Sequence, residues 1–362
     1  MTKGRLIIVL GLMAVLITFI LFIFYRYGKV PCAPDCIGAN LSGRDLRGMD
    51  LEGVNLSKAK LSRAILSGAN LQFTDLRGAD LRNARLDGAD LSGANLAGAD
   101  LRETQLFGVN LNGANLSAAN LTQAVLTRVV LNDVDFEGAI FKQARLIGAD
   151  LSRARLSGAD LSQANLTGAN LNEGQLQGSN LNEAVLVGAN LYSASLNGAA
   201  MSQANLNSAN LNQADLEGAD LSSALLTGAD LRQTDLTGAN LYAADLAGAS
   251  LDKAKLSTAV LTRARAEGAI LTGADLSGTI FAGVSKDTPS GTFEAASFAG
   301  ASLARADLSG AYLAGASLDG CNLKGANLSG AVLTDTVRFN GHSQTVTTSL
   351  EGVSSNDHTV WP

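Results

Sequence analysis

Residues 79–101 read ADLRNARLDGADLSGANLAGADL, and this stretch already contains the rule that most of the chain follows. Leucine returns at every fifth position, and alanine stands two residues before each leucine. From Leu41 to Phe281 an apolar residue falls at every fifth position without a gap. The main departures from leucine in this ladder are Phe136, Phe141, Met201 and Ala266. A five-residue period is neither the 3.6-residue period of an α-helix nor the alternation of a long strand.

The repeated unit is A-(N/D)-L-x-x, as in residues 79–81 and 169–171. Such a unit forms one short extended side of a coil and then turns. Four units close a square, so residues twenty apart stack at about 4.8 Å and their backbones hydrogen-bond in parallel. Leucine and alanine then face a narrow lumen that holds large and small side chains in alternation. We number the four walls by their ladder residues, beginning on the first to fourth wall with Leu41, Leu46, Leu51 and Leu56.

With this register the sequence resembles the pentapeptide repeat family over residues 37–335, which is about 58 units or some fourteen coils. The resemblance implies an all-β fold, a right-handed quadrilateral parallel β-helix. It implies little about function, because the family includes many members without an assigned activity and fold does not fix function.

The residue that closes each unit differs between the walls. It is nearly always glycine on the second wall, as at Gly48 and Gly68, and often glycine on the fourth. On the first and third walls it is usually long and polar, as at Gln123 and Glu173. The pattern predicts that alternate corners need a positive φ, which glycine adopts without steric cost, so that two turn types alternate around the coil.

Breaks in the register divide the chain. Pro289 and Gly291 mark an outward loop, after which the apolar ladder resumes twelve residues on instead of ten. In the resembled family such loops can carry partner contacts, but a tolerated surface insertion is the simpler explanation. Val337, Phe339 or Trp361 is expected to cap the open end of the last coil. The predicted segments are a tail with a transmembrane helix (1–29), a linker and N-terminal cap (30–38), the β-helix (39–283), a loop (284–292), the β-helix continued (293–337) and a polar C-terminal tail or cap (338–362).

Residues 6–25 read LIIVLGLMAVLITFILFIFY, enough for one transmembrane α-helix. A cleaved signal peptide is the alternative, but the residues that follow lack an A-x-A-like cleavage site. Positive charges before and after the helix nearly balance, at Lys3 and Arg5 against Arg26 and Lys29. Because a short N-terminal tail usually stays inside, the sequence predicts a single-pass anchor with an extracytoplasmic β-helix.

The cysteines leave two alternatives open. Cys32 and Cys36 in the segment CAPDC form a disulfide if their compartment is oxidising, and otherwise are two free thiols in a linker. A zinc site needs four ligands, and the other candidates, Cys321, His342 and His358, lie far along the chain. Cys321 stands at an inward alanine position, which indicates a core residue rather than a reactive thiol.

No catalytic constellation is present in the repeat. The only histidines stand in the C-terminal segment, which excludes a histidine-based triad within the coil. Carboxylates such as Asp80 and Asp220 precede the ladder leucine and face outward, where no concave dry pocket separates their pKa values. We therefore expect a non-enzymatic protein without cofactor or metal.

Mimicry of duplex DNA to bind DNA gyrase is the best-known activity in the resembled family, and it is our alternative function. The coil carries a net charge of about −8 over about 70 Å, whereas duplex DNA of that length carries about 41 negative charges. Nucleic acid itself is no expected partner of an acidic chain with a net charge of −6. An ice-binding surface is disfavoured because outward threonines form no continuous column.

Large apolar side chains are most frequent at outward positions on the second wall, whereas the first wall has about three (Ile140, Val260, Ile280), the third about two (Val130, Ile270) and the fourth none. Those on the second wall form a predicted docking wall for a protein, a second copy included. Its residues are Ile65, Phe107, Val125, Ile147, Val185, Val187 and Leu225. The alternative is that intervening polar residues break the patch, namely Arg85, Gln105, Arg145, Asn165, Asn205 and Asp245. The predicted function is a membrane-anchored structural or protein-interaction module.

Overall fold

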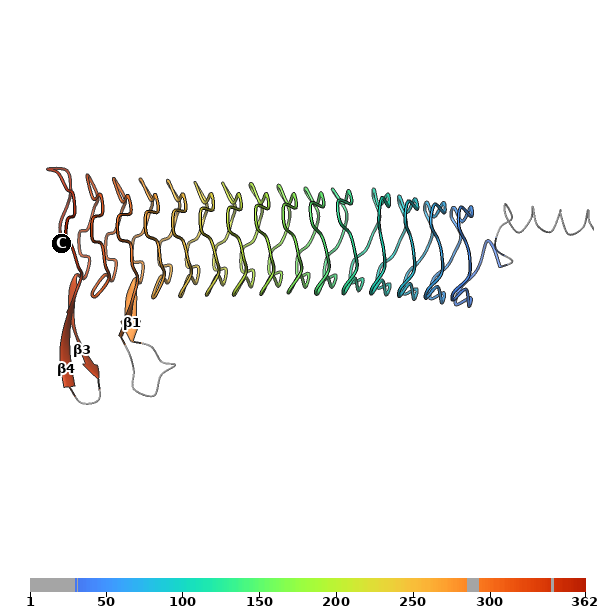
Figure 1. Cartoon of the computed structure of the whole chain (residues 1–362), viewed down its shortest axis with the longest axis horizontal. Coiled ribbons are helices and arrows are strands. Elements are labelled where there is room, and N and C mark those ends of the chain that lie inside the picture. The colour runs from blue at the N-terminus through green and yellow to red at the C-terminus, as the bar shows by residue number, and fades with distance from the viewer. Residues whose placement is uncertain (1–29, 31, 285–292, 340–341) are drawn as a thin grey trace, which may run out of the picture.

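A computed structural model describes residues 30, 32–284, 293–339 and 342–362. The chain winds as a long rod of stacked coils that runs from the N-terminal to the C-terminal end (Figure 1). Parallel bridges join residues twenty apart, such as Asp80 to Asp100 and Asp160 to Asn180. The predicted five-residue register and the β-helical fold are confirmed.

The backbone bonds of one unit explain why a five-residue repeat suffices. The Leu81 amide donates to the Asp100 carbonyl at 2.8 Å, and the Asp100 amide donates back to the Ala79 carbonyl at 2.9 Å. The Ala84 amide donates to the Leu81 carbonyl at 2.8 Å and closes the turn within the coil. Each unit therefore satisfies its own corner and pairs with both neighbouring coils.

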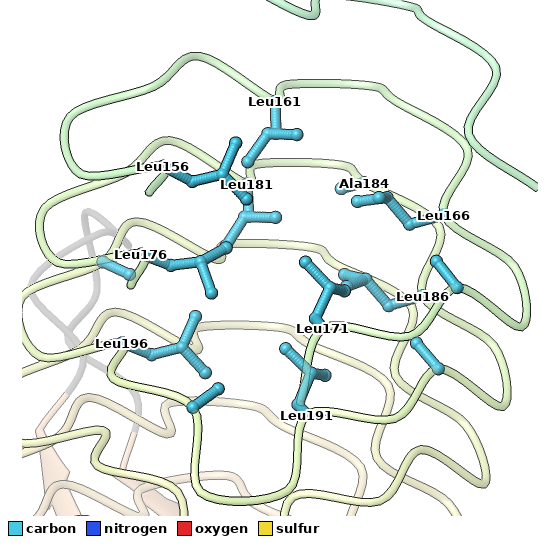
Figure 2. Packing of buried hydrophobic residues seen from close by; sticks show 14 of the residues in the cluster. Leu156, Leu161, Leu166, Leu171, Leu176, Leu181, Ala184, Leu186, Leu191 and Leu196 are labelled. Atoms are coloured by element: carbon cyan, nitrogen blue, oxygen red, sulfur yellow. The ribbon is translucent and has the colours of Figure 1, made fainter. Parts of the chain in front are cut away.

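The lumen is filled as the pattern predicts. Ladder leucines of successive coils stack in columns, such as Leu156, Leu176 and Leu196 (Figure 2). These leucines and the alanines between them, such as Ala159, are fully buried. Burial of one leucine is worth about 1.5–3 kcal/mol, so the repeated core is the main source of stability.

The expectation that two turn types alternate is wrong. Positive φ occurs at polar corners as well as glycine corners, with 59° at Gln143 and 56° at Arg153 beside 63° at Gly148. Every wall therefore turns through the left-handed region, which costs an L-residue about 1–2 kcal/mol. Stacked side chains at the polar corners offset part of this cost. Gln143 Nε2, for example, donates to Gln163 Oε1 at 3.0 Å in the next coil.

One junction interrupts the ladder. Within the described residues 32–284, the bridge between Asn110 and Val130 is missing, and several amides at this junction donate to no carbonyl of the adjoining coil. They are the amides of Gly108, Leu111, Gly113, Val130 and Asp135. The coils stand farther apart here than on either side (Figure 1). We call this place the open junction.

Valine in the lumen accounts for the open junction. Val109 and Val129 occupy the inward alanine position in successive coils, and Val134 follows in the next unit. Extra methyl groups overfill a close-packed lumen and force the backbone apart. A stacked pair alone does not, because Val54 and Thr74 share one column and the bridge from Asn55 to Asp75 is intact.

The first hairpin lies at the predicted break in register. Strand β1 (Ala282–Val284) pairs antiparallel with β2 (Phe293–Ala295), and residues 285–292 of the predicted loop lie outside the described chain. The excursion begins at Ala282, two residues before the predicted boundary, and the parallel ladder resumes at Ser297, which pairs with Arg265.

The C-terminal segment differs from the polar tail that the sequence suggested. Strands β3 (Thr334–Phe339) and β4 (His342–Thr347) form a second hairpin, so Val337 and Phe339 lie on β3. After it the chain adds a last coil, in which Ser349 pairs with Ser317 and Val360 with Asn327. Buried threonines at 348 and 359 replace the inward alanines, which hid this coil from the sequence pattern. The last coil caps the rod, whereas Trp361 stays 42% exposed.

A short segment covers the other end. Val30 and Cys36 are buried against the first coils, and Asp35 pairs with Asn55. Cys32 and Cys36 form a disulfide within this segment. In the part of the chain that the structure describes, no helix has the length and hydropathy to cross a membrane. The predicted anchor, residues 6–25, lies outside that part.

Candidate docking surface

The second wall presents two outward columns, one on each side of its ladder leucines. Residues before the leucine form a bridged column that includes Gln105, Val125, Arg145, Asn165 and Val185. Residues after it form the second column, to which Phe107, Ile147 and Val187 belong. All seven predicted docking residues lie in these two columns, and Phe107 and Leu225 are 55% and 41% exposed.

The structure brings five of the seven together. Val185 and Val187 flank Leu186 in one coil, and Phe107, Val125 and Ile147 alternate between the two columns in three successive coils. Asn165 and Thr167 separate these two groups by a single coil. We call these five residues the central strip. Ile65 and Leu225 stand apart, because the neighbours of Ile65 are Asp45 and Arg85 and those of Leu225 are Asn205 and Asp245.

The glycine corners beside the central strip have no side chains that project above it. Gly168 and Gly188 have positive φ, and a methyl group added at either would meet no atom within 4 Å, so no side chain rises at these positions. Arg128 is the exception, and its stem lies over Gly148. A flat strip of this kind permits close approach of another surface.

Three coils of the second wall carry opposite charges on the two sides of one ladder residue, whereas Arg145 and Asp245 have uncharged counterparts, Ile147 and Ala247. Arg47 pairs with Asp45, Arg85 lies 3.5 Å from Asp87, and Arg265 lies 3.7 Å from Glu267. Hydrogen bonds from the Arg47 side chain are the main reason that the pKa of Asp45 falls to about 2. The pairs are exposed, so each adds little to stability.

A second apolar column, which the sequence did not predict as a continuous feature, lies on the first wall near the C-terminal end. Val260, Ile280, Tyr312 and Val332 are bridged in successive coils. The Tyr312 hydroxyl donates to Asp335 Oδ2 at 2.7 Å. Burial, and then this carboxylate, raise the pKa of Tyr312 to about 12. The signal was present in the register shift of twelve residues, which places Tyr312 beside Ile280.

The outward carboxylates have structural partners. Asp80 accepts from Arg82 Nε at 2.8 Å, and Asp100 accepts from Arg102 Nε at 2.8 Å. The hydrogen bonds from Arg82 lower the pKa of Asp80, which keeps it ionised and unsuited to act as a general acid. A shallow hollow lined by Arg63, Arg82 and Arg102 adjoins these pairs and is open and polar.

No chemistry of another kind is assembled among the described residues. They contain no cluster of three or more His, Cys, Asp and Glu side chains that could hold a metal ion. Cys321 is buried in the lumen, and its Sγ lies 2.9 Å from the Phe298 carbonyl. Burial raises the pKa of Cys321 to about 11, so the thiol stays protonated at neutral pH.

Comparison with known proteins agrees with the geometry. The family model described as pentapeptide repeats matches overlapping segments from residue 35 to 285 and again residues 296–335. This chain belongs to the pentapeptide repeat family. The resemblance inferred from the five-residue register is thus confirmed, and as a pentapeptide repeat protein the chain is a structural or interaction module. No curated protein matches it.

Several solved pentapeptide repeat structures are similar to this chain. HetL from the cyanobacterium Nostoc, involved in heterocyst differentiation regulation, is 32% identical over 80% of this chain and 92% of its own, with a TM-score of 0.31. A protein of the Arabidopsis thaliana thylakoid lumen is 35% identical over 30% of this chain and 66% of its own, with a TM-score of 0.22. QnrB1, a plasmid-mediated fluoroquinolone resistance protein, is 19% identical over 59% of this chain and 92% of its own, with a TM-score of 0.28.

Proposed function

We propose that this pentapeptide repeat protein is a non-enzymatic, membrane-anchored rod that binds a protein through its second wall. The central strip carries the proposal, because it places large apolar side chains at outward positions of a wall whose corners are largely glycine. A solvated wall needs no such residues.

The anchor is residues 6–25, and the rod lies on the extracytoplasmic side. The length and apolar character of that segment support the anchor. A disulfide between Cys32 and Cys36 is what an oxidising compartment maintains, and so supports that side of the membrane.

Topology is tested with a cysteine introduced at Ser355, an exposed residue of the last coil. Cys321 is buried, and Cys32→Ser with Cys36→Ser in the same chain removes the other two thiols, so background labelling is low whichever compartment holds the rod. A membrane-impermeant maleimide should label Ser355→Cys in intact cells as fully as in lysed cells. Labelling only after lysis would place the rod in the cytoplasm.

Partner binding is tested by changing Phe107, Val125, Ile147 and Val187 together to serine. The variant should fold, because these side chains face outward, and should lose cross-linked partners. A matched control makes the same number of changes to serine on the fourth wall, at Asn95, Asn115, Gln177 and Asn197. Equal partner recovery and equal mass by light scattering in both variants would refute the docking wall.

The alternative function, inhibition or protection of DNA gyrase by DNA mimicry, lacks the charge that it needs. Several outward carboxylates form salt bridges with arginines that neutralise their charge, such as Asp75, Asp80 and Asp230. Purified full-length protein should therefore leave gyrase supercoiling unaffected at micromolar concentration. Inhibition at submicromolar concentration would instead support DNA mimicry.

A further inference from the structure

We infer that the second wall binds a second copy of this chain, with the two rods side by side, running in the same direction, and related by a two-fold axis parallel to them. This inference rests on the proposed function, because it names the partner of the same wall.

The symmetry fixes which residues meet. A two-fold axis parallel to the rods keeps each coil at its own height and reverses the direction across the wall. The residue before a ladder leucine therefore faces the residue after the same leucine in the other copy. Val185, for example, faces Val187 of the second copy.

Charge on the second wall fits this arrangement. Where both flanking positions of a described second-wall coil are charged, the charges are opposite, so each meets its complement in the other copy. These pairs are Asp45 with Arg47, Arg85 with Asp87 and Arg265 with Glu267. Complementary charges align an interface and exclude wrong registers.

The other walls fit less well. On the fourth wall Asp135 and Glu137, and again Asp215 and Glu217, flank a single ladder residue, so the same symmetry would set like charges against each other. Asp50 and Glu52 do so on the third wall. The first wall is compatible in charge but has no counterpart to the central strip, since its apolar column lies near the C-terminal end.

An antiparallel pair makes less use of the flanking charges. In that arrangement each column faces itself, and centring the pair on Asn165 sets Ile147 against Val187 but Val185 against Arg145. The parallel pair sets Val185 against Val187 but Arg145 against Ile147, so apolar contact alone does not decide between the two. All three flanking charge pairs meet their complements only in the parallel pair, and this favours it.

A shared membrane supports the same orientation. Two rods anchored near their N-termini start from one plane and point the same way, which aligns their coils. The wall from Asp45 to Arg265 is about 53 Å long at about 4.8 Å per coil. With a contact width of about 10 Å, each copy buries about 500 Å², below the roughly 800 Å² of a standard interface. Tethering raises the effective concentration, so pairing should be strong in membranes and weak in dilute detergent.

The test uses full-length chains with two different tags, co-expressed in one membrane. One copy carries Val185→Cys and the other Val187→Cys, and mild oxidation follows. Mixed disulfide dimers should exceed same-variant dimers roughly tenfold, since a disulfide forms only between closely facing Cβ atoms. The matched control is Ser195→Cys with Asn197→Cys on the fourth wall of the same coil, which should yield only background.

A charge reversal adds a second readout. Arg85→Glu should reduce the mixed dimer, and Arg85→Glu with Asp87→Arg should restore it. Mixed dimers no more abundant than the fourth-wall control, or preferred cross-linking of Arg145→Cys to Val185→Cys, would overturn the parallel pair. If self-pairing fails while the quadruple serine variant still loses a different protein, the docking wall stands and only this inference falls.

Discussion

The coils from Leu146 to Leu276 and the open junction differ mainly in one lumen position. In the regular coils alanine stands two residues before most ladder leucines, and the backbone ladder is continuous. At the open junction Val109, Val129 and Val134 take that position, and the ladder parts. Whether neighbouring coils form their backbone hydrogen bonds therefore depends more on the volume of this small residue than on the leucine.

The largest expected effect comes from charge in the lumen. Leu161→Asp should cost about 3–5 kcal/mol, because it removes a buried leucine and leaves a carboxylate without a partner. Leu111→Asp at the open junction should cost less, since fewer backbone bonds hold these coils together and they can separate to admit water. Chemical denaturation of both variants gives the comparison, and an equal cost would show that the junction is dry.

Ser162→Asp is the control for the inward assignment. It places the same carboxylate one residue later, at a position that faces solvent. Its free energy of unfolding should remain close to that of the unchanged protein. A loss as large as that of Leu161→Asp would contradict the register on which the fold depends.

The next effect comes from moving the valines into a regular region. Ala189→Val, Ala209→Val and Ala214→Val together reproduce the spacing of Val109, Val129 and Val134 four coils further on. Overfilling should cost about 1–3 kcal/mol and part the coils there. The amides of Leu191, Ser193 and Asn210 should then exchange with deuterium faster. Unchanged exchange would show that valine volume does not cause the opening.

The sequence predicted the regular coils because their signal is repeated. A five-residue apolar ladder with inward alanine fits only the four-sided β-helix, and every further repeat strengthens that prediction. The corners were predicted wrongly, because glycine frequency was taken as a measure of φ. Gln143 and Arg153 adopt the same left-handed conformation, and the stacked side chains that support it come from neighbouring coils.

Structural features that occur only once could not be predicted from the repeat pattern. The last coil uses Thr348 and Thr359 in place of alanine, so its register looked polar. The apolar column of Ile280 and Tyr312 needs the bridge across the first hairpin, which the ladder alone does not define. The outward positions of the seven second-wall residues were predictable from the register, whereas the opposite charges that flank single leucines acquire meaning only with the geometry.

A smaller effect is expected at the corners. Gly168→Ala should cost about 1 kcal/mol, because φ is 62° and the added methyl group meets no neighbour. Gly108 has φ 61° and equally open surroundings, but its amide lacks the bond to the next coil. Gly108→Ala should therefore cost less, since an unbonded corner can relax. Thermal melts that give equal losses would mean that the strain is purely local.

The smallest expected effect is that of a surface substitution, which distinguishes surface residues from lumen residues as the cause of the open junction. Val130 is 52% exposed in a column where Asn170, Asn190 and Asn210 stack through side-chain bonds of about 3 Å. Val130→Asn would extend that ladder toward Asn110 and should stabilise the protein by no more than about 0.5 kcal/mol.

If lumen volume parts the coils, Val130→Asn leaves the Leu111 and Gly113 amides in fast exchange. Replacing Val109, Val129 and Val134 by alanine should instead slow the exchange of both amides, because the coils can close and form the missing bonds. Hydrogen exchange by mass spectrometry distinguishes the two variants on the same peptides. Protection gained from Val130→Asn alone would assign the junction to its surface residues and remove valine as the explanation.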